Sequence, residues 1–166
     1  AHGRRNGFTG SWSGSAGPWE DGNMKILISA CLLGIPCRYD GRAKSQPWAE
    51  ALAGRHDLVP VCPEQLGGLP TPRTPSERRG DRVVMNTGAD VTEQYRRGAE
   101  AALRLCRLTG CEAAILKERS PSCGCGEIYD GSFSGTLTAG DGVTAELLRK
   151  NGIPVYGESH VAALLD

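Results

Sequence analysis

Three cysteines follow predicted strands at positions where their thiols can act together as soft ligands. They are Cys31, Cys62 and Cys123, and each comes after one of the short apolar runs at 26–29, 58–61 and 113–116. Ligands of open α/β sheets bind beyond the carboxyl ends of parallel strands. We therefore expect the three thiols to meet at one edge of a sheet, as a metal or cluster site with an open coordination position.

The other cysteines have different surroundings in the sequence. Cys106 falls on the apolar face of a predicted helix and Cys111 begins a strand, so both are interpreted as structural. Cys37 can be a fourth ligand, a redox partner or a packed thiol in a turn. Cys125 forms Cys-Gly-Cys with Cys123, and spacing alone leaves either of them as the ligand.

The type of donor indicates iron–sulfur chemistry. Thiolates are soft ligands that suit iron–sulfur clusters, whereas catalytic zinc usually has histidine among its ligands. The three histidines, His2, His56 and His160, do not accompany the cysteine motifs. Three thiolates on a four-iron cluster would leave one iron open to a substrate.

Polar residues beside these cysteines are candidates for proton transfer and substrate binding. Glu64 follows Cys62 by two positions, and Pro63 stiffens the connection, so its carboxylate can activate water or move a proton. A helix cap or a solvated side chain is the alternative role. Ser120 and Ser122 can donate hydrogen bonds to a substrate, and turn chemistry is their alternative role.

Two further features resemble anion sites only superficially. A basic run in the long segment after Pro63 can contact an anionic substrate or an RNA phosphate, but a solvated loop is favoured; it comprises Arg73, Arg78, Arg79 and Arg82. The glycine-rich stretches 131–135 and 140–142 lack the Gly-Lys-Ser/Thr of a P-loop and match no dinucleotide fingerprint. Nucleotide binding is therefore excluded as a primary function.

Composition sets the class of protein. The chain has 166 residues, with nineteen basic and nineteen acidic side chains, so its charge indicates neither a nucleic-acid nor a membrane partner. No apolar run approaches the ~20 residues that cross a bilayer. Seven cysteines, an odd number, without a secretory signal favour a reducing cytoplasm.

Residues 1–23 are rich in glycine and serine and are predicted to be a flexible leader, with Met24 as the natural start.

Alternating elements predict the fold of residues 24–166 as a single domain. Strands are expected at 25–29, 56–61, 112–116 and 153–156, and helices at 47–53, 90–109, 140–150 and 159–164. The longest helix is predicted to be capped by Asp90 with Glu93 and to end at Gly110. A long loop or short hairpin is expected from Pro63 to Gly88. This order predicts a Rossmann-like three-layer α/β/α domain with a mainly parallel sheet of four or five strands.

Several motifs in the same order resemble a bacterial family whose characterised members are thiouracil desulfidases. They are Ser29–Gly34, Cys37–Gly41, Val61–Glu64, Pro70–Arg73, Lys117–Gly124 and Ile128–Gly131. The resemblance implies an oxygen-sensitive [4Fe-4S] cluster held by Cys31, Cys62 and Cys123, whose open iron binds the sulfur of the substrate. It also implies proton transfer by Glu64 and substrate positioning by Ser120, with Ser122 as an additional contact.

Three functions follow from these observations. The first is a desulfidase that converts a thiolated pyrimidine and water to the pyrimidine and hydrogen sulfide, without net redox change. The second is a non-catalytic cluster or metal-binding module that senses iron or sulfide or carries sulfur. The third is a thiol redox protein that uses Cys31 with Cys37 or Cys123 with Cys125, although neither pair has the Cys-x-x-Cys spacing.

Overall fold

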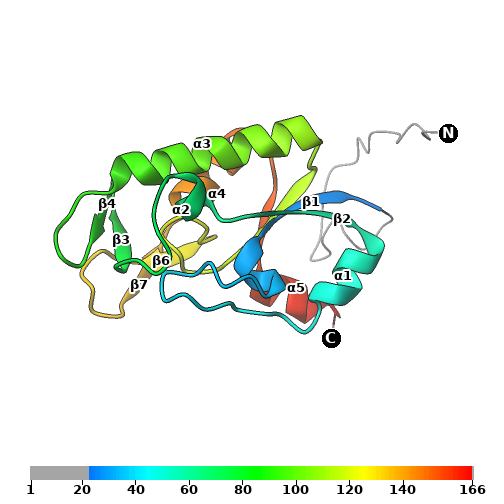
Figure 1. Cartoon of the computed structure of the whole chain (residues 1–166), viewed down its shortest axis with the longest axis horizontal. Coiled ribbons are helices and arrows are strands. Elements are labelled where there is room, and N and C mark those ends of the chain that lie inside the picture. The colour runs from blue at the N-terminus through cyan, green and yellow to red at the C-terminus, as the bar shows by residue number, and fades with distance from the viewer. Residues whose placement is uncertain (1–22, 166) are drawn as a thin grey trace.

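A four-stranded parallel sheet lies at the centre of the computed structural model, which describes residues 23–165 (Figure 1). Its strand order is β2-β1-β5-β8. The strands are β1 (Lys25–Ser29), β2 (Asp57–Val61), β5 (Ala113–Leu116) and β8 (Val155–Gly157). The predicted parallel sheet is confirmed, with four strands. All but the last residue of the predicted leader, 1–23, lies outside the described residues.

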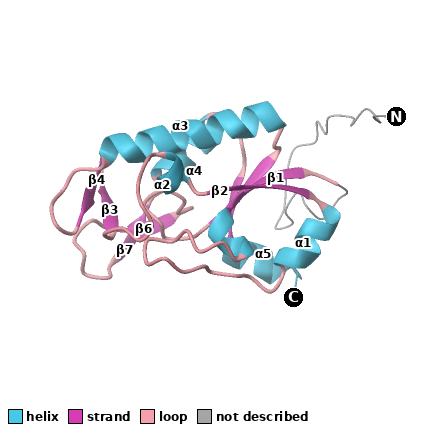
Figure 2. Cartoon of the chain, in the orientation of Figure 1, coloured by secondary structure: helices cyan, strands magenta, loops and turns pink. Residues whose placement is uncertain are grey.

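Helices cover both faces of this sheet (Figure 2). Ile26 and Ile28 of β1 pack in one core cluster with α1 and α5, whereas Leu27 packs on the opposite face against α3 and α4. The helices are α1 (Ala49–Arg55), α3 (Thr92–Thr109), α4 (Val143–Lys150) and α5 (Glu158–Leu165). Residues 26–29 of β1 are all buried while successive side chains point to opposite faces, as a sheet covered on both sides requires, and the predicted three-layer fold is confirmed.

The longest helix, α3, has the apolar face that its sequence spacing predicts. The buried residues of that face are Val91, Tyr95, Ala99, Ala102, Leu103 and Cys106, and Gly110 ends the helix in the left-handed conformation. The predicted cap by Asp90 is wrong, because the helix begins at Thr92. Asp90 instead accepts a hydrogen bond from the Thr92 amide at 2.9 Å and pairs with Arg82.

Strand β2 is less buried than the apolar run at 58–61 would suggest. It lies at the edge of the sheet, and only Val61 in it is buried. Pro60 has no amide hydrogen to donate, which an edge strand tolerates. An apolar run of this length occurs in edge strands as well as in central ones, so it does not predict how deeply β2 is buried.

Two small hairpins extend from the sheet at the same end of the molecule (Figure 1). The predicted loop from Pro63 contains the short helix α2 (Pro63–Leu66) and the hairpin of β3 (Ser76–Arg79) and β4 (Arg82–Met85). The second hairpin, β6 (Glu127–Tyr129) with β7 (Leu137–Ala139), was not predicted. Its three-residue strands are too short to show alternation.

Two glycines let α2 pack directly on α3. A Cβ on Gly98 would lie 1.9 Å from the carbonyl oxygen of Pro63, and a Cβ on Gly67 would lie 1.9 Å from that of Gln94. Any larger side chain must push these backbones apart. The position of α2, and hence of the Glu64 that it carries, depends on this contact.

We predict that Gly98→Ala lowers the free energy of unfolding by about 2 kcal/mol, because overpacking forces the α2 and α3 backbones to move apart. Urea unfolding followed by circular dichroism measures the change. The matched control is Gly54→Ala in α1, where a Cβ meets nothing within 4 Å, so a small gain in stability is expected. Equal stabilities of the two variants would contradict the proposed contact.

Candidate functional site

A cavity of about 480 Å³ opens at the carboxyl edge of the sheet. The thiol-bearing residues Cys31, Cys37, Cys62 and Cys123 all line it, together with Glu64. Three segments that are far apart in the sequence therefore bring their cysteines to one place, as the strand order predicts.

Local structure after each strand places the first two thiols. Cys31 lies in a 3₁₀ turn, Ala30–Leu33, that directly follows β1 and ends at Gly34 in the left-handed conformation. Cys62 directly follows β2 and precedes α2, in which Pro63 is the first residue. Proline is favoured there because its ring fixes a helical φ and the first turn needs no amide hydrogen. The chain thus turns away immediately after each cysteine and leaves its side chain at the edge.

Hydroxyl groups shape the loop that carries Cys123. The Ser120 hydroxyl oxygen accepts hydrogen bonds from the amides of Ser122 and Cys123, both at 3.1 Å. The start of the loop is held by Ser29, whose hydroxyl accepts the Lys117 amide at 2.9 Å. These bonds fold residues 117–124 into a compact turn, and the thiol of Cys123 is buried within it.

Burial and mutual contacts favour the protonated thiols of Cys62 and Cys123 in the absence of a cation. Burial raises the pKa of Cys123 to about 12, although hydroxyl contacts from Ser29 and Ser122 oppose the shift. A hydrogen bond with Cys37 and burial raise the pKa of Cys62 well above its usual range. A bound metal reverses this preference, because coordination deprotonates a thiol.

Cys37 lies among the predicted ligands. Its thiol interacts with those of Cys31 and Cys62, and the contact with Cys31 raises the pKa of Cys37. Its backbone carbonyl accepts the Cys62 thiol at 3.6 Å and the Arg73 guanidinium at 2.9 Å. The segment that contains Cys37 is thereby attached to the cavity wall.

The remaining cysteines lie away from the cavity. The thiol of Cys125 donates to the carbonyl of Val155 at 3.4 Å and contacts Arg149, and Cys125 does not line the cavity. Cys106 is buried in the core, with its thiol 3.7 Å from the carbonyl of Cys111. Within Cys-Gly-Cys, Cys123 therefore faces the cavity and Cys125 does not.

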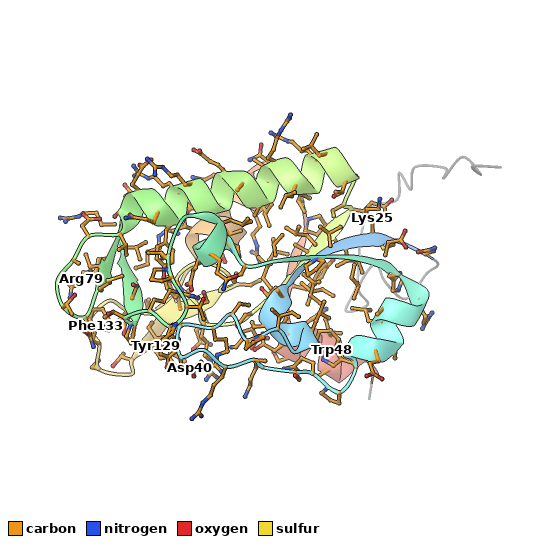
Figure 3. The ribbon with its side chains drawn as sticks, in the orientation of Figure 1. Lys25, Asp40, Trp48, Arg79, Tyr129 and Phe133 are labelled. Atoms are coloured by element: carbon orange, nitrogen blue, oxygen red, sulfur yellow. The ribbon has the colours of Figure 1, made fainter. Side chains whose placement is uncertain are left out.

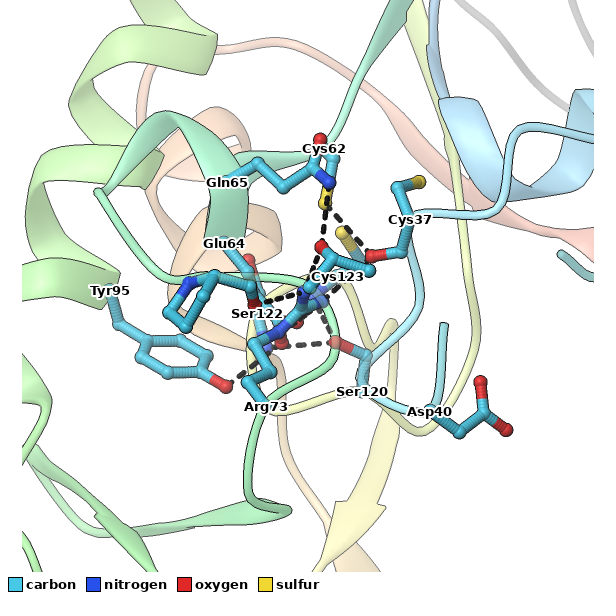
Figure 4. A network of polar contacts seen from close by, with 12 residues as sticks. Cys37, Asp40, Cys62, Glu64, Gln65, Arg73, Tyr95, Ser120, Ser122 and Cys123 are labelled. Carbon is cyan, nitrogen blue, oxygen red and sulfur yellow. Dashed lines mark hydrogen bonds and ion pairs between the residues drawn. The ribbon is translucent and has the colours of Figure 1, made fainter. Parts of the chain in front are cut away.

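Two partners fix the carboxylate of Glu64 (Figure 4). Arg73 donates from Nε to Oε2 at 2.8 Å and also from Nη2 to the same oxygen, and Tyr95 donates its hydroxyl to Oε1 at 2.9 Å. The side chains of Arg73 and Glu64 are only 3% and 12% exposed. A carboxylate oxygen has two acceptor sites, so Oε1 keeps one for a further hydrogen bond.

The prediction that the basic run is a solvated loop is wrong for Arg73. Arg73 is buried and joins Glu64 to the carbonyls of Cys37 and Pro70. Arg78 pairs with Glu146, and only Arg82 has a largely exposed side chain in its ion pair. Spacing could not identify Arg73, because its acceptors come from segments that the sequence does not place beside it. The helical spacing of Tyr95 predicts only a position on the buried face of α3, and nothing in the sequence indicates its hydroxyl contact with Glu64.

The two candidate serines separate in the structure. Ser120 lines the cavity, and its oxygen already accepts two amides, so its O–H can be donated toward a bound molecule. Ser122 does not line the cavity, is 1% exposed, and places its hydroxyl 2.9 Å from that of Thr144. Ser122 therefore packs against Thr144 away from the cavity lining, and its contact with a substrate stays a prediction.

The donor set fits a cluster better than a single ion. Among residues 23–165, no three histidine, cysteine or acidic side chains converge closely enough to hold one metal ion. The cavity is lined by thiols and by no histidine, and it is far larger than the ~30 Å³ that one water occupies. Separate irons of a cluster accept separate, more widely spaced thiolates.

A three-layer α/β fold with four thiols and a fixed carboxylate at its carboxyl edge is the arrangement expected of an α/β enzyme that holds a metal or cluster through soft ligands. The comparisons identify the family. The model of the 2-thiouracil desulfurase family matches residues 26–160, and the chain belongs to this family.

Relatives of known sequence or structure agree with this assignment. The uncharacterized protein YbbK of Bacillus subtilis (strain 168) is 42% identical over 150 residues, which cover 84% of this chain and 99% of YbbK. The solved structure of TudS, a [4Fe-4S]-dependent thiouracil desulfidase, has 51% sequence identity and a TM-score of 0.79. That match covers 86% of this chain and 95% of the TudS chain.

We predict that Arg73→Met lowers the free energy of unfolding by about 3 kcal/mol, because it leaves the Glu64 carboxylate buried without its cation. Urea unfolding measures the loss. Adding Glu64→Gln to this variant removes the unpaired charge and should recover part of the stability. A double variant no more stable than Arg73→Met would contradict the explanation.

Proposed function

We propose that this protein is a desulfidase that converts thiouracil and water to uracil and hydrogen sulfide, with a [4Fe-4S] cluster held by Cys31, Cys62 and Cys123. The observation that carries the proposal is the convergence of these three thiols and the Glu64 carboxylate in one cavity. Family membership and the match to a [4Fe-4S]-dependent thiouracil desulfidase support the substrate and the cofactor.

The proposed reaction needs a proton acceptor and a fixed substrate orientation. When bound, the cluster supplies an open iron that is a Lewis acid with affinity for sulfur. Glu64 accepts a proton from the attacking water at Oε1, the oxygen with an unused acceptor site, and returns it to the departing sulfur. Ser120 donates its O–H to a polar edge of the pyrimidine. Atoms balance, since water supplies the new oxygen and both protons of hydrogen sulfide, and no electron is transferred.

Arg73 and Tyr95 are positioning residues in this proposal. Arg73 donates to Oε2 and Tyr95 donates to Oε1, so the carboxylate cannot rotate. Because Arg73 also binds the carbonyl of Cys37, the distance between Glu64 and the cysteine segment is fixed. Positioning of this kind lowers the barrier by removing the need to reorganise the base during the reaction.

The cavity also weighs against the two alternative functions. A sensor or sulfur-carrier module needs no carboxylate held by two buried partners beside the thiols. A redox pair of Cys123 and Cys125 is disfavoured because the Cys125 thiol is directed to Val155 and Arg149. Cys31 and Cys37 do interact, but Cys31 serves as a cluster ligand in the proposal.

We also infer a cytoplasmic enzyme that binds a small thiolated pyrimidine through one α/β domain, residues 24–166. All seven cysteines are free, as expected in a reducing compartment. Within residues 23–165, no helix combines the length and apolar character that crossing a membrane requires.

Replacement of a ligand should remove the cluster, and replacement of its neighbour should not. We predict that Cys123→Ser, like Cys31→Ser and Cys62→Ser, loses most of the bound iron and acid-labile sulfide after anaerobic reconstitution. Cys125→Ser is the matched control and should retain both, because its thiol lies outside the cavity. Iron and sulfide analysis with a visible spectrum makes the measurement. A brown, fully loaded Cys123→Ser protein would exclude this residue as a ligand.

Loss of the proton acceptor should leave cofactor binding intact. We predict that Glu64→Gln keeps the cluster spectrum but lowers kcat for thiouracil at least 100-fold, as is typical when a general base is removed. Uracil formation is followed by chromatography under anaerobic conditions. Glu112→Gln changes an exposed carboxylate outside the cavity and should retain full activity. Wild-type turnover by Glu64→Gln would exclude the proposed role.

A further inference from the structure

One wall of the cavity comes from the hairpin end of the molecule. Tyr129 of β6 and Phe133 of the β6–β7 turn both line the cavity, and Figure 3 shows them on the same hairpin, with Phe133 beside Arg79. The thiols, by contrast, come from the carboxyl ends of the sheet strands. None of the residues that act in the proposed reaction belongs to this second wall.

The backbone of Phe133 is strained. Its φ is +55°, in the left-handed region that a bulky side chain rarely adopts. Among residues 23–165, the positive φ values belong to glycines, with Arg119 and Phe133 as the two exceptions. Both exceptions line the same cavity. Strained residues persist where the surrounding structure holds them, and they cluster at functional sites.

A buried carboxylate holds Phe133 in this conformation. Glu77 of β3 is 9% exposed, and its Oε1 accepts the amides of Gly131 at 3.0 Å and Phe133 at 3.2 Å. By accepting two amides of the turn, the Glu77 carboxylate stabilises Phe133 in a backbone conformation that glycine adopts more readily. The buried charge thus has a specific use, which is to fix the turn 130–135 against β3.

Arg79 holds the same turn from outside. Its Nε donates to the carbonyl of Gly131 at 2.7 Å, and its guanidinium lies 5.8 Å from the centre of the Phe133 ring. A cation over an aromatic face at this distance is attracted to it. The ring of Phe133 is therefore held by its backbone and by the Arg79 cation, and the residue lines the cavity.

We propose that Phe133 is a specificity-determining residue whose ring forms the outer wall of the substrate site, and that Glu77 is the positioning residue that holds it there. This inference rests on the proposed function, since it concerns how that substrate is bound. A pyrimidine also has two flat faces, and one of them can lie on the Phe133 ring while the in-plane sulfur is directed to the cysteines. Stacking on an aromatic side chain recognises that flat face and supplies binding without touching the reacting bond.

Steady-state kinetics of the cluster-loaded protein tests the proposal. Phe133→Ala and Phe133→Gly should raise KM for 2-thiouracil roughly tenfold and leave kcat within about twofold, because stacking binds substrate and transition state alike. Phe133→Tyr keeps a flat ring and should restore KM. Phe133→Gly also removes the backbone strain, so its melting temperature should not fall, which separates a lost contact from misfolding.

Binding of uracil gives a readout that does not require turnover. Isothermal titration of the anaerobic, cluster-loaded protein should show the same roughly tenfold weakening of uracil binding in Phe133→Ala. Glu77→Ala should weaken uracil binding to the same extent. Glu77→Gln should bind uracil like the wild type, because its amide oxygen can still accept the two amides. The double variant Glu77→Ala/Phe133→Ala should bind uracil no more weakly than either single variant. Thr138→Ala, on an exposed position of the same hairpin outside the cavity, should change neither KM nor binding.

The outcomes distinguish this inference from the function on which it rests. Loaded wild-type protein that leaves thiouracil intact would overturn the proposed function, and with it the inference. Active wild type with unchanged KM and unchanged uracil binding in both Phe133→Ala and Phe133→Gly would overturn the inference alone. A lower kcat at constant KM would also overturn it, because the ring would then act on the chemical step and not on binding.

Discussion

The buried ion pair between Arg73 and Glu64 is the interaction on which the site depends. Taking two charges out of water is costly, and the cost is recovered only if each charge is paired and its remaining hydrogen bonds are satisfied. Arg73 meets this condition by donating to Glu64 on α2, to the carbonyls of Cys37 and Pro70, and to the hydroxyl of Thr71. Three segments must therefore be correctly placed at once. The same constraint that makes the pair costly makes the geometry of the cavity specific.

The scaffold limits where this pair can form. The parallel sheet brings the first turn after β1 and the start of α2 to one edge, and the close packing at Gly67 and Gly98 sets α2 against α3. That packing also brings Tyr95 of α3 to Oε1 of Glu64. The helices α2 and α3 thus place the Glu64 carboxylate close to its partners, and Arg73 from the following loop completes the ion pair. Functional groups held by rigid elements are more precisely placed than groups carried on loops alone.

Features that repeat locally could be predicted from the sequence. The apolar period of α3 identified its buried face, and the alternation of strands and helices was enough for the parallel sheet and for the meeting of Cys31, Cys62 and Cys123 at its edge. Features that depend on a distant partner could not be predicted. Cys123 and Cys125 differ only in the direction of their side chains, which the surrounding turn determines. The roles of Arg73 and Glu77 depend on acceptors and donors many residues away, and the β6–β7 hairpin has strands too short to show a period.

The two kinds of charge in the cavity are neutralised independently. Glu64 has its own cation in Arg73, whereas burial raises the pKa of Cys123 to about 12 and so favours its neutral thiol. Without a cluster, the buried thiols of Cys62 and Cys123 are therefore expected to be protonated, and Glu64 keeps its pair with Arg73. We therefore expect the fold to persist without the cofactor, unlike small metal domains in which metal binding supplies the folding free energy. The affinity for the metal then depends on how readily the thiols release their protons. The position of Glu64, which Arg73 and Tyr95 hold, does not depend on metal binding.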